Sequence, residues 1–459
     1  MKSFRLALVR HEQPDCLDYD DEDEVRRFEI AMRVYRAHGE AYSVTPLDGR
    51  VDGAYRVVGK TGASGEAWLV DVVDASGTHD ACQCPDFLNN DLGTCKHIEA
   101  VRRAIAKVPE LRRAFTRLGQ EPRTPTLTVS AVGALGLVEA GPWTARHRAR
   151  LGLVRDAARS HVALEDAAPL NAGFRGDLRV VHAALRVAAL GKERSTIAAR
   201  RAAIEAALRA GRLRFDMLAH PLFPYQEEGA AHLVAAGRAL LADDMGLGKT
   251  VQAIAACELL RARGEAARVL IVTCASLKHQ WQREIERFAG ERAVVVSGGR
   301  PERRTAFESD APYKILNYEL TWHELAQLRS LDADVVVFDE AQRAKNFRTK
   351  TAATLRAIPS RFTFVLTGTP VENRLDDLYS LLQLIEPGVL GPLWKFNLAF
   401  ARQNDRGRIV GYKNLSGLRE RIAPVMMRRR KEEVLTELPS LTQQTRYTRL
   451  TAEQTELEQ

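Results

Sequence analysis

The segment Asp243–Thr250, DDMGLGKT, constrains the fold of this chain more than any other stretch. An apolar run, 238–242, precedes it and an apolar-periodic segment, 251–260, follows it, so a strand, a glycine loop and a helix are predicted in that order. This order is typical of a phosphate-binding loop at a helix N-terminus. Asp243 occupies the position of the first glycine in the full P-loop pattern.

The side chains of this loop indicate a nucleotide and a cation as ligands. Gly246 and Gly248 let the backbone turn its amides inward, because no Cβ stands in the way. Lys249 can reach the β- and γ-phosphates, and the Thr250 hydroxyl can ligate magnesium. The alternative is a glycine-rich turn with an incidental lysine. Motifs elsewhere in the chain that could complete a nucleotide site help to decide between the two.

A pair of acids forms the partner motif. The run 334–338 predicts a buried strand that ends at Asp339 and Glu340, which places both carboxylates at the carboxyl edge of a sheet, where ligands bind. Asp339 can hold magnesium, and Glu340 can orient and polarise the attacking water. Two further apolar runs, 269–273 and 362–367, predict neighbouring buried strands. We therefore expect an α/β fold with a doubly wound parallel sheet.

The segment 222–229, upstream of the loop, supplies candidates for recognising the base. Gln226 can donate to and accept from adenine, and Tyr225 can pack on its ring. ATP and magnesium are thus the expected cofactors. The predicted site contains Tyr225, Gln226, Gly246, Gly248, Lys249 and Thr250 for the nucleotide, Thr250 and Asp339 for magnesium, and Lys249, Asp339 and Glu340 for catalysis.

A second constellation lies nearer the N-terminus. Short alternating strands, 54–58 and 67–73, lead into a set of metal-ligating residues, and a helix, 98–107, follows. The set is Cys82, Cys84, Cys95 and His97. Three thiolates and one imidazole complete a tetrahedral zinc site with no open position, so structural zinc is expected and hydrolytic zinc chemistry is not. Three buried cysteines and an unrelated histidine are the alternative. The C-x-C…C-x-H spacing, with CPDF and CKH, resembles the SWIM zinc finger.

Composition limits the remaining possibilities. A chain of 459 residues is long for one core, so two to four domains are expected. No run reaches the length of a transmembrane helix and no signal-peptide core is present, so a cytoplasmic protein is expected. Six cysteines, three of them close together, indicate a reducing compartment with one metal site. The net charge of +8 favours a polyanionic partner, but a solvated arginine-rich surface accounts for it as well.

The motifs together resemble those of the Swi/Snf-type ATPases of helicase superfamily 2. DDMGLGKT, DEAQRAKN (339–346) and LTGTPVEN (366–373) stand nearly intact and in order, and 418–439 resembles the family's connector into a second lobe. The resemblance runs from about Leu222 to the end of the chain. It implies a RecA-like lobe and a DNA-dependent ATPase that translocates on or remodels double-stranded DNA without separating its strands.

The resemblance also assigns roles by position. It gives nucleotide roles to Gln226, Lys249, Thr250, Asp339 and Glu340. Roles in contacting DNA, or in coupling DNA to ATP, fall to Lys278, Trp281, Gln342, Thr367, Gly368 and Thr369. An RNA helicase is the rival of the same broad class, and the extension Arg343–Asn346 after the acids favours a DNA translocator.

A family motor has two lobes, and the second supplies an arginine finger to the ATP site. This sequence stops at Gln459, where the second lobe would be starting, so we expect half of a motor that binds ATP, hydrolyses it slowly and binds DNA weakly and in a salt-dependent way. The expected partner is double-stranded DNA, with no membrane. Two sources of the second lobe stay open: a separate chain, if the motor is split, or a longer form of this chain, if the sequence is a truncation. The rival from another class is a non-hydrolysing, ATP-responsive adaptor that binds DNA or protein.

We divide the chain into five segments on these grounds. They are an N-terminal arm (1–45), a small α+β zinc-finger module (46–118), a helical connector (119–216), the RecA-like lobe (217–425) and a connector that begins the second lobe (426–459). The arm carries an acidic run, 18–24, and an expected helix, 25–37. The helical connector is expected to contain helices around 148–159, 178–190 and 195–210, with a basic cluster at 146–150 interpreted as an exposed helix face.

Overall fold

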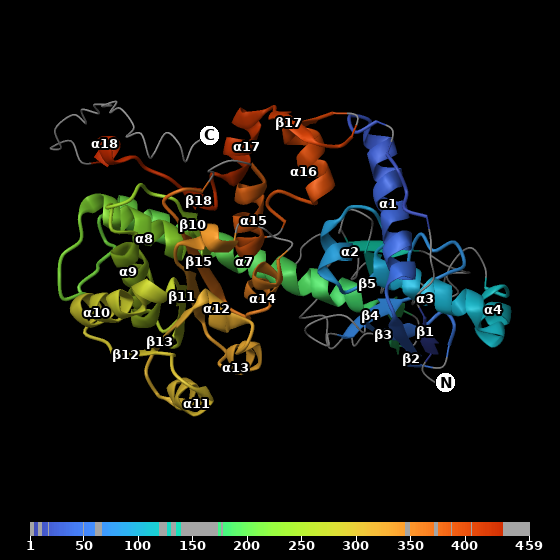
Figure 1. Cartoon of the computed structure of the whole chain (residues 1–459), viewed down its shortest axis with the longest axis horizontal. Helices are drawn as coiled ribbons and strands as arrows, with labels where there is room; N and C mark the ends of the chain where they lie inside the picture. The colour runs from blue at the N-terminus through green and yellow to red at the C-terminus, as the bar shows by residue number, and fades with distance from the viewer. Residues whose placement is uncertain are drawn as a thin grey trace, which may run out of the picture.

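The structure is a computed structural model that describes residues 4–7, 12–16, 18–48, 50–59, 67–118, 126–129, 135–138, 173–175, 178–344, 349–370, 375–386, 388–404 and 406–434. The expected helix 148–159, the basic cluster 146–150 and the motif ends at 345–346, 371–373 and 435–439 lie outside these residues. Figure 1 shows an α/β lobe and an N-terminal module with the long helix α7 (His182–Arg209) running between them.

The α/β lobe contains the expected parallel sheet. Its seven strands are all parallel and follow the order β12-β13-β11-β14-β15-β10-β18. Their bounds are β10 Arg238–Leu241, β11 Val269–Thr273, β12 Ala293–Val295, β13 Tyr313–Asn317, β14 Val335–Phe338, β15 Phe362–Leu366 and β18 Met426–Met427. Four predicted strands are confirmed to within a residue. They are the strand before the phosphate loop, the strand before the paired acids and the strands in the other two apolar runs. β18 lies beyond residue 425, so the lobe extends past its expected end.

Helices cover this sheet on both faces. They are α8 Pro224–Ala236, α9 Lys249–Ala262, α10 Lys278–Ala289, α11 Arg300–Glu308, α12 Tyr318–Thr321, α13 Leu325–Ser330, α14 Lys350–Arg356 and α15 Leu375–Ile385, with short 3₁₀ turns at Ala275–Leu277 and Ala341–Ala344. Along β14, Val335 and Val337 enter one core with α8 and α9, whereas Val336 and Phe338 enter the other with α15. Because both faces are buried, the strands are apolar throughout and the sheet is doubly wound, as predicted.

The N-terminal module is built on a five-stranded antiparallel sheet, in the order β1-β2-β3-β4-β5. Its elements are β1 Phe4–Leu6, α1 Glu22–Gly39, β2 Tyr42–Pro46, β3 Ala54–Gly59, β4 Ala67–Asp71, β5 Ala81–Cys82, α2 Pro85–Asn89, α3 Lys96–Lys107 and α4 Pro109–Phe115. The helix expected over 25–37 is confirmed within α1. The prediction of a separate N-terminal arm, 1–45, is wrong, because β1 and β2 belong to this sheet. Val44 lies opposite Val57, and both side chains are fully buried.

The helical connector contains strands that the sequence did not predict. Four of them, β6 Thr126–Val129, β7 Leu135–Val138, β8 Gly173–Arg175 and β9 Leu178–Val180, form a sheet in the order β7-β6-β9-β8. The helix expected from residue 178 is therefore wrong for its first residues and begins at His182. Leu127 and Val129 are buried in the core of the N-terminal module, and this tertiary packing overrides the helix-favouring Ala- and Arg-rich composition.

Helix α7 joins the two parts of the molecule. Ala183 and Ala184, at its start, are buried in the N-terminal core, whereas Ile204, near its end, is buried in the lobe. The Arg200 guanidinium lies over the Phe362 ring at 4.6 Å. With 28 residues the helix is about 42 Å long.

The two parts also meet at a second place, through α16 (Leu393–Phe400) of the lobe. The Trp394 indole donates a hydrogen bond to the Asn90 carbonyl oxygen at 2.8 Å, and Lys395 pairs with Asp91 at 2.7 Å. Trp394 also lies in a small buried cluster with Cys16, Val25 and Leu92. After α16 come a hairpin of β16 Ala401–Gln403 and β17 Ile409–Tyr412, then α17 Leu415–Ile422 and α18 Lys431–Val434.

We expect Trp394→Ala to loosen this second contact. Removing a 5% exposed indole should lower the free energy of unfolding by about 3 kcal/mol, because it leaves a cavity and takes the donor from Asn90. Hydrogen exchange should show faster exchange in Asn90–Leu92, and thermal unfolding should occur earlier. The matched control is Trp322→Ala, since Trp322 is 42% exposed. Unchanged exchange at Asn90–Leu92 in the Trp394 variant would contradict the contact.

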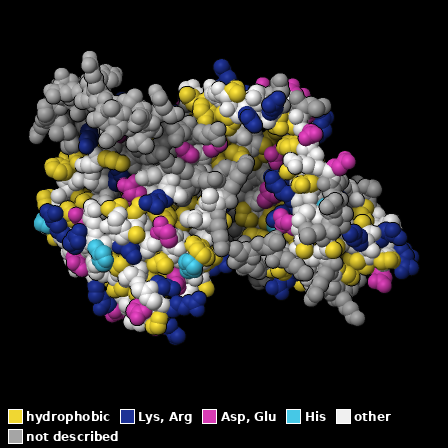
Figure 2. Space-filling view, viewed as in Figure 1, with side chains coloured by type: hydrophobic (Ala, Val, Ile, Leu, Met, Phe, Trp, Pro, Cys, Tyr) yellow, Lys and Arg dark blue, Asp and Glu magenta, His cyan; other side chains and the backbone are white. Residues whose placement is uncertain are grey.

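Two features of the surface complete the description. Within the described residues no helix is both long and apolar enough to cross a bilayer. Figure 2 shows Lys and Arg side chains spread over both parts on this face rather than gathered in one patch. The net charge of +8 therefore does not single out one part of this face as a polyanion site.

Candidate nucleotide site and metal centre

The phosphate loop lies between β10 and α9, as predicted. Gly246 and Gly248 have φ angles of 89° and 72°, which glycine adopts without strain. Lys249 begins α9, and its ammonium donates to the carbonyl oxygens of Asp243 at 2.7 Å and Asp244 at 3.3 Å. The loop thus folds around the side chain that is expected to bind phosphate.

The charge of Lys249 is balanced by acids from two segments, the phosphate loop and the end of β14. Burial lowers the pKa of Lys249, and the carboxylates of Glu340, Asp243 and Asp339 oppose this by favouring the ammonium form. The paired acids are therefore close enough to Lys249 to interact with it electrostatically. Thr250, the next residue of α9, is partly exposed.

Asp339 is held rigidly at the carboxyl end of β14. One oxygen of its carboxylate accepts from the Thr273 hydroxyl at 3.0 Å and from the Trp281 indole at 2.7 Å. Burial raises the pKa of Asp339, and these two hydrogen bonds act in the opposite direction. The Tyr318 hydroxyl donates to the Asp339 carbonyl oxygen at 2.8 Å. Two segments therefore fix the orientation of this carboxylate, and a third holds the Asp339 backbone.

The position of Trp281 separates the two roles implied for it. Its side chain is 2% exposed and bonded to Asp339, so it fits a coupling role and not a direct contact with DNA. Lys278, one turn earlier on α10, reaches Asn317 at 3.2 Å and stays partly exposed.

Glu340 begins a chain of hydrogen bonds between two motifs. The Gln342 amide donates to the Glu340 carboxylate at 2.5 Å, and the Thr367 hydroxyl donates to the Gln342 amide oxygen at 2.9 Å. The Thr369 backbone N–H then donates to the Thr367 hydroxyl at 3.2 Å. Glu340 itself has a φ of 50°, a left-handed conformation that is costly for a non-glycine residue and clusters at functional sites.

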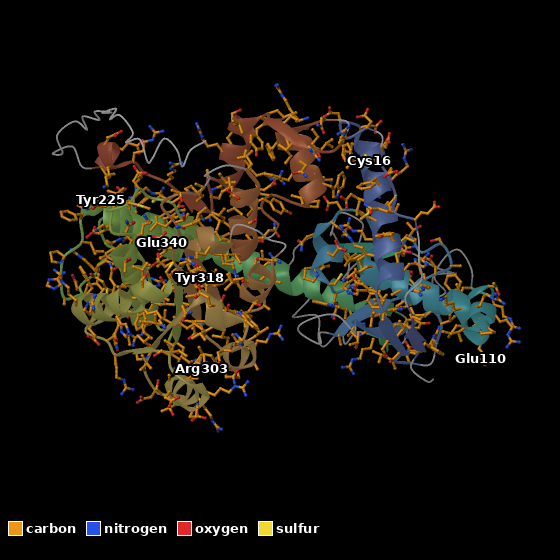
Figure 3. All side chains as sticks on the ribbon, viewed as in Figure 1. Cys16, Glu110, Tyr225, Arg303, Tyr318 and Glu340 are labelled. Carbon is orange, nitrogen blue, oxygen red and sulfur yellow. The ribbon has the colours of Figure 1, made fainter. Side chains whose placement is uncertain are left out.

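The turn after β15 packs directly against the phosphate loop. A Cβ on Gly368 would lie 3.0 Å from Met245 Cγ and 3.6 Å from the Lys249 ammonium, so the turn leaves little room for a larger residue. The loop, the paired acids and this turn therefore meet at one edge of the sheet. Figure 3 shows Glu340 and Tyr318 near each other in the lobe and Tyr225 at the start of α8.

The base-recognition candidates lie at the start of α8. Gln226 is buried, and its amide oxygen accepts from the Phe223 N–H at 3.1 Å. Its amide nitrogen lies 2.5 Å from where a Cβ on Gly248 would stand, so it faces the loop. The Tyr225 ring stacks on Phe223 with centroids 5.7 Å apart. Sequence reasoning missed Phe223, whose ring is 62% exposed and offers an aromatic surface beside Tyr225.

Asp243 has partners that sequence reasoning also missed. Its carboxylate is completely buried, and it accepts from the Arg429 guanidinium at 2.5 Å and from the Gln252 amide at 3.2 Å. A buried carboxylate in the place of a glycine requires a cation nearby. That requirement was the signal available in the sequence, and the arginine run 428–430 contained the partner.

The four metal-ligating residues are brought together as predicted. The ligand atoms of Cys82, Cys84, Cys95 and His97 all lie within 4.8 Å of one another, and all four residues are buried. His97 Nδ1 is 3.9 Å from the sulfurs of both Cys82 and Cys95. A tetrahedral site with bonds of about 2.3 Å to sulfur and 2.0 Å to nitrogen needs edges of roughly 3.5–3.8 Å. Only a small contraction separates the observed arrangement from that geometry.

The surroundings of the centre suit a bound cation. The Phe87 N–H points at the Cys84 sulfur at 3.3 Å, and the Cys84 N–H points at the Cys82 sulfur at 3.4 Å. Such donors orient thiolate ligands. Burial raises the pKa of Cys82 and Cys95, so their thiolate forms need a compensating positive charge.

Comparisons with known proteins agree with this geometry. Residues 225–459, just over half of the chain, match the family described as SNF2-related domain. YwqA of Bacillus subtilis (strain 168) is 33% identical over 248 residues, which are 51% of this chain and 27% of that protein. The DNA repair and recombination protein RAD54B of Gallus gallus is 33% identical over 209 residues, 42% of this chain and 23% of that protein.

Similarity extends to solved structures. The Sulfolobus solfataricus SWI2/SNF2 ATPase core in complex with dsDNA is 30% identical, with 48% of this chain and 47% of that chain covered and a TM-score of 0.43. The chain spans about a quarter of the length of YwqA and of RAD54B.

Proposed function

The chain belongs to the SNF2-related domain family, and from that membership we propose that it binds ATP with magnesium as the first lobe of a DNA-dependent ATPase. The complete motor then uses hydrolysis to move along or remodel double-stranded DNA. A relative named for DNA repair and recombination supports DNA as the partner. Because the chain covers only part of such relatives, the activity of the whole motor is part of this proposal.

One observation carries the proposal: three motifs far apart in the sequence meet around Lys249. The loop residues contact its ammonium, the acids balance its charge and the Gly368 turn packs beside it. A cation in a cradle of backbone amides, beside fixed carboxylates, is suited to a nucleotide triphosphate with magnesium. A glycine-rich turn with an incidental lysine would not require these neighbouring motifs.

Each side chain has a proposed task. Lys249 binds the β- and γ-phosphates, Thr250 and Asp339 hold magnesium, and Glu340 orients and polarises the attacking water. The Gln342–Thr367 hydrogen bonds connect Glu340 to the turn after β15, so a change at the γ-phosphate is passed to that turn.

Two further sets of residues are proposed to act on DNA and on turnover. Lys278 and the Thr367–Thr369 turn belong to segments that contact DNA or couple it to ATP, and phosphate contacts make the affinity salt-dependent. Full catalytic power requires an arginine finger, which the family's second lobe supplies. That lobe and its source, in the same chain or a separate one, remain part of the proposal.

The metal centre is proposed to be a SWIM-type zinc site with a structural task. Cys82, Cys84, Cys95 and His97 would fill all four positions of a tetrahedral ion, which supplies cross-linking and no reactive water. Cys84 N-caps α2 and Cys95 N-caps α3, so a bound ion would tie two helix starts to the end of β5. 

Glu340→Gln tests the enzymatic proposal. The variant keeps the size and the hydrogen bond to Gln342 but loses the base, so ATP hydrolysis should fall at least about 100-fold while ATP affinity stays within about twofold. Single-turnover hydrolysis of labelled ATP, with and without duplex DNA, measures the first quantity even when turnover is slow. Equilibrium binding of a fluorescent ATP analogue with magnesium measures the second.

The same experiment separates the enzyme from the adaptor. An adaptor that only binds ATP would give equal background hydrolysis for the wild type and for Glu340→Gln. Glu308→Gln is the matched control, since Glu308 is exposed at the end of α11 and pairs only with its neighbour Arg304 among the described contacts. An equal loss in both variants would show that the effect is not specific to Glu340.

A further inference from the structure

The segment Met426–Val434, which we call the strap, continues the sheet beside the phosphate loop. β18 pairs with β10, and the Ala242 N–H donates to the Met427 carbonyl oxygen at 2.7 Å. The ladder then passes into the loop, where the Asp244 N–H donates to the Arg429 carbonyl oxygen at 3.0 Å. The strap therefore follows the first part of the loop residue by residue.

Arg429 anchors the strap in the interior. Its guanidinium donates to the Asp243 carboxylate at 2.5 Å, to the Gln252 amide oxygen at 2.9 Å and to the Tyr225 carbonyl oxygen at 2.5 Å. Asp243 and Gln252 are completely buried. A Cβ on Gly229 would lie 1.7 Å from the Gln252 oxygen and 2.8 Å from Arg429, so only glycine fits there. Four segments thus meet at one guanidinium.

Lys431 brings a second ammonium group to the loop. Its backbone N–H donates to the Asp244 carboxylate at 3.2 Å. Its side-chain Cε and Nζ both lie 3.1 Å from where a Cβ on Gly246 would stand, so the side chain covers that glycine. Lys249 holds the carbonyl oxygens of Asp243 and Asp244 in the same loop. Two ammonium groups from distant parts of the chain therefore converge on residues 243–246.

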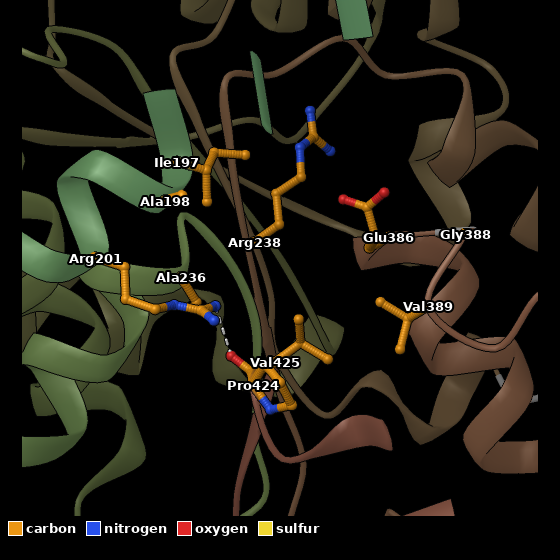
Figure 4. A pocket seen from close by; sticks show the side chains of 10 residues that line it. All are labelled: Ile197, Ala198, Arg201, Ala236, Arg238, Glu386, Gly388, Val389, Pro424 and Val425. Carbon is orange, nitrogen blue, oxygen red and sulfur yellow. Dashed lines mark hydrogen bonds between the residues drawn. The ribbon is translucent and has the colours of Figure 1, made fainter. Parts of the chain in front are cut away.

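Packing is incomplete just before the strap. There the Arg201 guanidinium of α7 donates to the Pro424 carbonyl oxygen at 2.7 Å, as Figure 4 shows. Pro424 also lines two pockets of about 390 and 370 Å³. Within the strap, Arg429 makes buried hydrogen bonds, and Lys431 follows it by two residues. We therefore expect the hydrogen bonds of Arg429 to set the position of Lys431.

We propose that Lys431 is a phosphate-binding residue of the nucleotide site and that Arg429 is the positioning residue that holds it there. This inference rests on the proposed ATP site. Lys431 is exposed, and it is its backbone N–H that donates to the Asp244 carboxylate. Its ammonium side chain lies over Gly246 of a loop built to bind anions. A phosphate in the loop therefore gains a second cation without any rearrangement of the buried Arg429–Asp243 pair.

The test compares nucleotides that differ in phosphate content. Lys431→Ala should weaken ATP–magnesium binding by about fivefold to tenfold, because a charge-assisted phosphate contact is lost, and should leave adenosine binding unchanged. Lys431→Arg should keep most of the ATP affinity. Arg430→Ala is the control, since Arg430 is an exposed neighbour on the same strap. Isothermal titration of the 459-residue chain with ATP, ADP and adenosine gives these ratios.

A double-mutant cycle tests the positioning role. If Arg429 acts by placing Lys431, then Arg429→Lys should weaken ATP binding in the wild-type background and add little in the Lys431→Ala background. Arg429→Lys keeps a positive charge beside Asp243 but cannot make the three bonds of the guanidinium. Additive losses would overturn the positioning role, whether or not the Lys431 contact is present. If Arg429→Lys fails to fold, Gln252→Ala, which removes one of its partners, replaces it in the cycle.

The outcomes distinguish this inference from the proposed function. Unchanged or tighter ATP binding by Lys431→Ala, with Lys249→Ala strongly impaired, would overturn the role of Lys431 and leave the ATP site standing. Unimpaired binding by Lys249→Ala would remove the ATP site itself, and the role of Lys431 with it. An equal loss of ATP and adenosine affinity would show a structural effect of Lys431 and would also overturn the inference.

Discussion

Lys249→Ala is expected to weaken ATP–magnesium binding by about 10- to 100-fold, or roughly 1.5–3 kcal/mol, the range for a hydrogen bond to a charged group. The ammonium lies inside the loop, against the carbonyl oxygens of Asp243 and Asp244, and faces Glu340 and Asp339. Without it, those carboxylates repel the nucleotide phosphates with no compensating cation. The loss should grow from AMP to ADP to ATP as the number of phosphates increases.

Equilibrium titration of the purified chain checks this expectation. Lys278→Ala is the matched control, because Lys278 is also a lysine in the first turn of a lobe helix but is bonded to Asn317. It should bind ATP as the wild type does. Equal ATP affinity in the wild type and Lys249→Ala would place the nucleotide elsewhere.

Cys84→Ser is expected to release zinc and unfold the N-terminal module. The Cys84 side chain caps α2, and its ligand atom lies within 4.8 Å of those of Cys82, Cys95 and His97 in a buried cluster. Structural zinc contributes on the order of 10 kcal/mol to small zinc domains, so loss of one ligand removes more stability than a typical domain possesses. The wild type should contain one zinc per chain, and the variant should contain far less.

Metal analysis and thermal unfolding measure the two effects. Cys274→Ser is the control, since Cys274 is partly exposed in the lobe and lies outside the metal-ligating set. Chelation of the wild type should reproduce the lower stability of Cys84→Ser. Full zinc occupancy in a Cys84→Ser, Cys95→Ser double variant would refute the assignment of these ligands.

The sequence was most informative where chemistry depends on neighbouring residues. The phosphate loop, the acids after β14, the Cys82–Cys84 pair and the Cys95–His97 pair are short local motifs, so their elements and most of their side-chain positions could be predicted. Their meeting at one sheet edge followed from the rule that ligands bind at the carboxyl ends of parallel strands. Lys249, Asp339 and Glu340 lie at that edge of the sheet.

The sequence was least informative where structure depends on distant partners. Arg429 and Asp243 are 186 positions apart. Asp243 in the place of a glycine indicates that a cation is needed, but nothing local to either residue shows which cation it is. β1 and β6 are short, and each becomes a strand only because a neighbouring strand pairs with it. Trp281 was placed among segments that contact or couple DNA, but the indole turns inward to Asp339, which the residue type alone does not reveal.

Helix α7 and the Trp394 contact together join the N-terminal module to the lobe at two separate points. If one contact joined the module to the lobe, the module could rotate freely about that contact. With two contacts it can rotate only about the line through them, and the continuous helix α7 resists that rotation as well. One extra residue in α7 would change the helical phase by about 100°, and the Asn90 carbonyl would no longer face Trp394. The register of α7 therefore sets the angle at which the N-terminal module is held against the lobe.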